Sequence, residues 1–157
     1  YGPGVMPYLT PYMAGRGRPA NSGPLDGNGR RSVYLMVRRN FLSPMLQAFD
    51  YPTPFTTIGR RGVSNVPAQA LTMMNNPFVV EQARHWAERV LAESDATPAD
   101  RVQSMYVAAL GRPADEAEMQ DALAFVGDAN SSSDSESQTW ADFAHVLFNL
   151  KEFIFIP

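Results

Sequence analysis

Residues 77–93 read PFVVEQARHWAERVLAE, and this stretch decides the fold class. Its apolar side chains recur at steps of three and four residues, the period of one helix face, at Val79, Ala83, Trp86 and Val90. The preceding Asn75-Asn76 and the first-turn Pro77 supply a capping side chain and a residue suited to a helix start. The stretch therefore predicts an amphipathic helix that ends at about Glu93.

Similar signals recur toward the C-terminus. Thr97-Pro98-Ala99-Asp100 combines a cap, a first-turn proline and an acid near the positive end of the helix dipole, and Gly111 ends the helix that follows. Residues 115–126 carry another apolar stripe, and a last helix is expected from about Thr139. Residues 127–138, GDANSSSDSESQ, lack core-forming side chains, so a flexible Ser-rich loop is predicted there.

Toward the N-terminus, Pro67 begins one more expected helix, so residues 67–157 form the helical part of the domain. Residues 1–66 form an irregular arm, because the first 29 residues contain seven glycines and five prolines. Alternation from Ser32 to Arg38 predicts a short strand, and Ser43-Pro44 begins a short helix. The expected fold is mainly α, with a C-terminal bundle of four to five helices, an Arg-rich arm and one or two short strands.

Composition limits the classes of function. The 157 residues are the size of one ordinary domain, and the absence of cysteine excludes disulfides, thiolate catalysis and covalent haem attachment within them. No apolar run of about 18 residues exists, so no membrane span is predicted. The start at Tyr1 lacks an initiator Met and a signal pattern, so we expect a fragment of a longer protein.

Charge is divided unevenly along the chain. Residues 1–67 hold eight arginines against Asp26 and Asp50, a net charge of +6, and residues 68–157 hold five basic against fourteen acidic residues, a net charge of −9. Internal salt bridging between the halves is the favoured interpretation, and no nucleic-acid partner is expected, because the acidic half would repel phosphates.

Three Arg-Arg pairs lie in the block from Arg30 to Pro77. Buried guanidinium groups need partners, and the block offers carboxylate and amide side chains. A structural polar network is the favoured interpretation; the alternative is a site for an anion, a sulfate or a carboxylate sugar at Arg39, Arg60 and Arg61. The candidate residues for either are Arg39, Asp50, Arg60, Arg61, Asn65, Gln69 and Asn75.

Other constellations fail on spacing. His85 and His145 match no zinc or haem pattern, and the loop that begins at Asp26 has Arg30 where a calcium ligand should stand. No serine has a neighbouring base in sequence, so no catalytic residue is assigned. The sequence favours a non-enzymatic role for this chain alone, with no metal and no cofactor of its own.

Three segments carry a family resemblance. Residues 37–83, residues 109–119 (ALGRPADEAEM) and residues 140–157 (WADFAHVLFNLKEFIFIP) resemble the planctomycete-specific C-terminal domain called domain of unknown function 1553 (DUF1553). The family motif maps onto Asp50, Arg60, Arg61, Asn65, Pro67, Gln69, Asn75 and Pro77. Asn76 departs from it, since an Asp is common at that position, and this weakens any metal proposal.

The resemblance implies a context but no activity. Family members are large exported multidomain proteins, periplasmic or at the cell surface, often with a cytochrome c domain and domain of unknown function 1549. It implies that haem c would belong to an associated domain or subunit, and that partners are the remainder of the polypeptide or other subunits, or a polysaccharide. Two hypotheses follow: an assembly module packed on domains that handle haem or polysaccharide, or part of an anionic-glycan site completed by upstream residues.

Overall fold

The chain is described by a computed structural model that covers residues 2–13, 15–52, 54–55, 57, 59, 67–127 and 133–154. It divides into two compact units, residues 1–72 and residues 73–157, which we call the arm unit and the helical unit.

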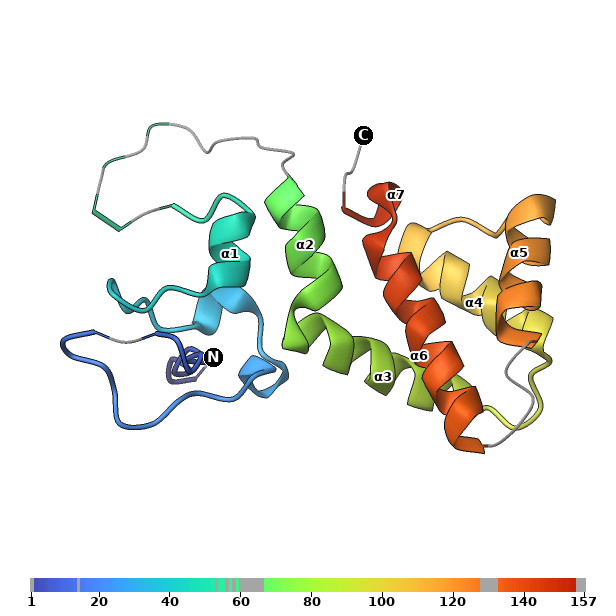
Figure 1. Ribbon diagram of the computed structural model, residues 1–157, viewed down its shortest axis with the longest axis horizontal. Coiled ribbons are helices and arrows are strands. Elements are labelled where there is room, and N and C mark those ends of the chain that lie inside the picture. The colour runs from blue at the N-terminus through green and yellow to red at the C-terminus, as the bar shows by residue number, and fades with distance from the viewer. Residues whose placement is uncertain are drawn as a thin grey trace. The chain divides into compact units, whose positions relative to one another are not determined.

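Seven α-helices form in the described residues, and the mainly α class is confirmed (Figure 1). In chain order they are α1 (Pro44–Ala48), α2 (Pro67–Asn75), α3 (Pro77–Leu91), α4 (Pro98–Leu110), α5 (Glu116–Gly127), α6 (Ser133–Asn149) and α7 (Lys151–Ile154). The boundary between the two units falls inside α2.

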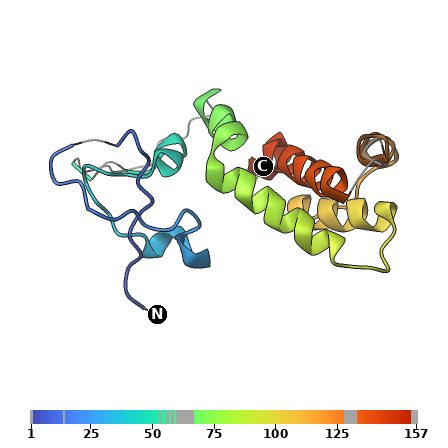
Figure 2. The same cartoon turned by 60° about the horizontal axis from the view of Figure 1, so that its bottom comes forward.

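The core of the helical unit lies between α3 and α6, the two helices that pack most extensively against each other (Figure 2). Ala83 and Ala87 of α3 and Ala144 of α6 are fully buried, and such small side chains let two helices approach closely. Met105 of α4 and Leu147 of α6 fill the centre of the core. Burying one side chain of that size contributes about 1.5–3 kcal/mol to folding.

The predicted helix caps at Asn76, Thr97 and Gly111 are confirmed. The Phe78 N–H donates to Asn76 Oδ1 at 2.9 Å at the start of α3. Thr97 and Asp100 form a reciprocal capping box at the start of α4. Gly111 follows α4 with φ +71°, the left-handed conformation that favours glycine after a helix.

The arm unit is held by main-chain contacts between distant segments. Val5 and Leu35 form a parallel bridge, in which the Val5 N–H donates to the Tyr34 carbonyl at 2.8 Å and the Val5 carbonyl accepts the Met36 N–H at 2.8 Å. The Gly23 N–H donates to the Pro7 carbonyl at 3.0 Å, and a Cβ at Gly23 would lie 1.8 Å from the Met6 carbonyl oxygen. Glycine is therefore required at position 23 by close approach of two backbone segments.

The strand expected from Ser32 to Arg38 does not form, and the described residues contain no strand. Ser32–Tyr34 is a 3₁₀ turn, closed by a hydrogen bond from Leu35 N–H to the Ser32 carbonyl at 3.0 Å. A strand needs a row of partners, and pairing here is limited to the bridge with Val5.

Two boundaries in the helical part also differ from expectation. Six helices, not four or five, follow from Pro67 among the described residues, because α7 adds a short final turn. α6 begins at Ser133, well before Thr139, so the Ser-rich loop expected over residues 127–138 is wrong at its C-terminal side. Residues 128–132 of that loop lie outside the described residues. None of the helices that the structure describes is long and apolar enough to cross a membrane.

Candidate functional site

Four of the seven predicted polar residues lie among the described residues: Arg39, Asp50, Gln69 and Asn75. Arg60, Arg61 and Asn65 lie outside the described residues. Arg39 is exposed and makes no hydrogen bond or ion pair with another described residue, whereas Gln69 on α2 is 4% exposed and has a partner.

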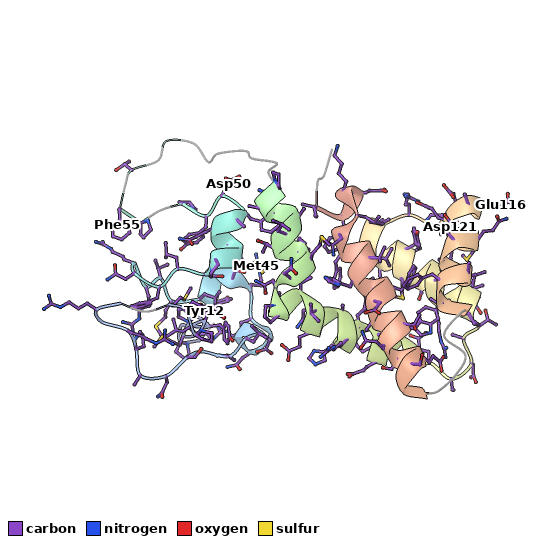
Figure 3. The ribbon with its side chains drawn as sticks, in the orientation of Figure 1. Tyr12, Met45, Asp50, Phe55, Glu116 and Asp121 are labelled. Atoms are coloured by element: carbon purple, nitrogen blue, oxygen red, sulfur yellow. The ribbon has the colours of Figure 1, made fainter. Side chains whose placement is uncertain are left out.

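Asp50 and Asn75, the two other described residues of the predicted set, also interact with other residues. Asp50 lies just after α1 (Figure 3), where it has φ +57° and its N–H donates to the Gln47 carbonyl at 3.2 Å. Asn75 is the exposed last residue of α2. Both residues have interaction partners. The predicted set stays a prediction.

The side chains of Arg30 and Arg31 have different surroundings in the arm unit. Arg30 Nη1 donates to the Pro3 carbonyl at 2.7 Å, and its guanidinium carbon lies 4.2 Å from the centre of the Tyr34 ring. This is a structural contact between two segments of the arm. The Arg31 carbonyl accepts the Tyr34 N–H at 2.9 Å, but its side chain is exposed and has no hydrogen bond or ion pair to another described residue.

Arg31 belongs to an exposed segment that we call the basic strip. Its members are basic or apolar and all are exposed: Arg31, Val33, Met36, Val37, Arg38 and Arg39. Val33 is 76% exposed and Val37 56% exposed. Beside the strip lies a cavity of about 30 Å³, whose lining includes Leu35, Phe41 and Tyr51.

The strongest polar constellation lies in the helical unit, at Arg112. Its guanidinium donates to both carboxylate oxygens of Glu118 at 2.7 Å each, and to both oxygens of Glu152 at 2.8 Å each. Glu118 also accepts the Asp115 N–H at 2.9 Å, while its own N–H donates to Asp115 Oδ1 at 2.8 Å. The cluster therefore joins the end of α4, the start of α5 and the short α7.

Sequence reasoning missed this cluster, although two signals were present. Arg112 lies in the segment ALGRPADEAEM, and Asp115 stands three residues before Glu118, the spacing of a reciprocal cap. Glu152 is forty residues from Arg112 in sequence. No local pattern relates residues that far apart, so the third member could not be predicted.

The cluster perturbs the titration of its members. Hydrogen bonds from Arg112 and from the Asp115 backbone hold the pKa of Glu118 at about 2, against a usual 4.5. Hydrogen bonds from Arg112 also lower the pKa of Glu152, and the two carboxylates raise the pKa of Arg112. Both carboxylates are hydrogen-bonded to the same guanidinium, so this arrangement offers no free acid or base.

An aromatic row crosses three helices of the helical unit. The Trp86 ring of α3 stacks on Phe148 of α6 at a centroid distance of 5.3 Å, and Phe148 contacts Phe153 of α7 at 5.2 Å. Phe153 is 37% exposed, so the row runs from the core to the surface. Glu152, the neighbour of Phe153, is bound by Arg112, which fixes the short helix that carries the last ring.

The histidines have different surroundings. His145 Nε2 lies 2.9 Å from the Met73 carbonyl oxygen. A carbonyl oxygen can only accept a hydrogen bond, so Nε2 carries the proton, and the contact is a structural one between α6 and α2. His85 is exposed on α3. Within the described ranges, no three His, Cys, Asp or Glu side chains gather closely enough to hold a metal ion. The chain cannot attach haem c covalently, because it contains no cysteine.

No curated protein and no solved structure matches the chain. A family model described as PSD1, protein of unknown function (DUF1553), matches residues 1–126. That range includes the arm unit, the cap at Asn76 and the ALGRP turn that bears Arg112, so the match extends over both units. With most of its length matched, the chain belongs to the DUF1553 family of proteins of unknown function.

Proposed function

We propose that the chain is a structural or assembly module of a large exported planctomycetal multidomain protein, packed on upstream domains that handle haem or polysaccharide. The aromatic row supports this function. A stacked row that ends at an exposed Phe153 presents apolar area that a covering surface would bury. Arg112 holds α7 in place beneath that surface, so the contact would be rigid before assembly.

Hydrogen–deuterium exchange tests the proposal. The 157-residue chain is compared with the longer parent polypeptide that contains its upstream domains. We expect slower exchange in the longer protein for residues 146–154, which span Val146 and α7, because the packed surface would exclude water. Equal exchange rates in the two proteins at those residues would contradict the assembly function.

An anionic-glycan site is the second candidate, favoured by the exposure of Arg39 without a described partner. Alanine at Arg60 and Arg61 tests it with heparin as the probe. Lost heparin binding with an unchanged circular dichroism spectrum supports the site, whereas unfolding of the variant would show that these arginines are structural. Export is tested separately, by locating the parent protein in periplasmic or surface fractions of the native cell.

A further inference from the structure

The basic strip has a charge that its neighbourhood does not balance. No acidic residue occurs between Asp26 and Asp50 in the sequence. Asp26 Oδ1 accepts the Asn28 N–H at 2.9 Å, and Asp50 has a partner of its own. Arg31, Arg38 and Arg39 form no ion pair with any described residue, so three guanidinium groups of the strip face solvent. Such a surface attracts an anionic partner.

The strip is also apolar. Val33 and Val37 are more than half exposed, and Met36 is 37% exposed between them. One exposed aliphatic side chain is ordinary, but three within five positions, flanked by arginines, match the composition of the contact area in protein–protein interfaces, where Met and Arg are enriched. Aliphatic groups of a partner would bury these side chains away from water.

The backbone of the strip forms hydrogen bonds with other residues of the arm unit. The bridge to Val5 holds Leu35, and the Phe41 N–H donates to the Arg38 carbonyl at 2.8 Å. Arg30, just before the strip, is anchored to the Pro3 carbonyl. A surface that is ordered before binding loses less conformational entropy when a partner arrives. The neighbouring cavity of about 30 Å³ has space for a methyl group of that partner.

We propose that the basic strip binds an acidic polypeptide segment that also carries aliphatic side chains, supplied from outside these 157 residues. Carboxylates of that segment pair with Arg31, Arg38 and Arg39, and its aliphatic side chains cover Val33 and Val37. A polypeptide fits better than a sulfated glycan, because a glycan would satisfy the charges and leave the valines in water. This inference rests on the proposed assembly function and gives the chemistry of one contact.

A short dye-labelled peptide of alternating Glu and Leu is the probe, with fluorescence anisotropy as the readout. We expect saturable binding that weakens as ionic strength rises. Peptides of Gln with Leu, or of Glu with Ser, should bind more weakly, because each lacks one of the two required properties.

Two double variants test the two properties of the strip. R38Q/R39Q removes charge and V33S/V37S removes exposed apolar area, and each should weaken peptide binding about tenfold. R84Q/R89Q is the matched control, since Arg84 and Arg89 are exposed on α3, and it should bind as the unaltered chain does. Circular dichroism verifies that all three variants fold.

Three results would overturn the proposal. Peptide binding that is equal in R38Q/R39Q and R84Q/R89Q would show that the strip is not the site. Heparin binding that is unchanged by V33S/V37S and stronger than peptide binding would assign the strip to an anionic glycan. No peptide binding, with residues 31–39 protected from exchange in this chain alone, would show that the acidic half of the same chain covers the strip.

Hydrogen exchange in the longer parent protein separates this inference from the proposed function. Protection of residues 146–154 without protection of residues 31–39 supports assembly and contradicts the strip proposal. Protection of both segments supports both.

Discussion

Arg112 and Glu152 form a two-pronged ion pair across forty residues of sequence, with Nε to Oε1 and Nη2 to Oε2 both at 2.8 Å. Glu118 occupies the remaining edge of the same guanidinium. One arginine therefore connects α4, α5 and α7. A planar group with five donors can serve two carboxylates at once, which a lysine ammonium cannot do with the same geometry.

Replacing Arg112 should lower the thermal unfolding midpoint. R112A should lower it more than E152A does, because the alanine leaves two carboxylates without their donor. R112K should fall between R112A and the unaltered chain, because it keeps the charge and loses the fork. Circular dichroism during heating measures the midpoints, with R84A as an exposed control. Equal midpoints for R112A and R84A would show that the cluster adds no stability.

Stability should fall as acid is added, and the direction follows from Glu118. Its pKa is about 2 in the folded chain against a usual 4.5, so the ionised group favours folding above pH 4.5. That contribution is lost as pH falls from 4.5 toward 2. Urea unfolding at a series of pH values measures the slope. E118Q should show a shallower slope in that window, and an unchanged slope would contradict the assignment.

Asn76 should be replaceable by Asp but not by Ala. N76A removes the oxygen that accepts the Phe78 N–H and should cost about 1 kcal/mol of unfolding free energy. N76D keeps that oxygen and adds a negative charge at the helix N-terminus, so it should be at least as stable as the unaltered chain. Urea unfolding compares the three proteins. A destabilised N76D would mean that the amide nitrogen of Asn76 has a role of its own.

Gly23 should tolerate no side chain. A Cβ there would meet the Met6 carbonyl oxygen at 1.8 Å, so G23A requires two backbone segments to separate. We expect a cost of about 1–3 kcal/mol, typical of overpacking. G15A is the control, because its Cβ would meet Phe41 at an ordinary 3.9 Å. Hydrogen exchange at residues 5–9 and 22–23 should accelerate in G23A and stay unchanged in G15A.

The local features of the fold were predictable from sequence. The caps at Asn76 and Thr97 and the turn at Gly111 depend on residues within one helical turn. Because these residues are neighbours in the sequence, a local pattern is enough to predict them. The strand predicted from Ser32 was wrong. Alternating side chains along one segment do not reveal whether a second strand is available to pair with it. The early start of α6 was missed because serines there gave no apolar period.

The site could be predicted less well than the fold. Arg30 contacts the Pro3 carbonyl and the Tyr34 ring. No pattern in the sequence shows that Arg30, and not its neighbour Arg31, makes these contacts. The sequence shows that α5 is acidic, and Figure 3 shows two of its acidic residues, Glu116 and Asp121. The sequence does not show that Arg112 binds Glu118. Pairing across the fold depends on tertiary placement, which composition does not encode.

The short helix that Arg112 secures also carries Lys151, which is the chain's single lysine among thirteen basic residues. It is exposed and adjacent to Glu152. Amine-directed reagents therefore have one side-chain target in the chain, located where the aromatic row reaches the surface. A dye or a short crosslinker attached at Lys151 would report on this end of the helical unit without the introduction of a cysteine.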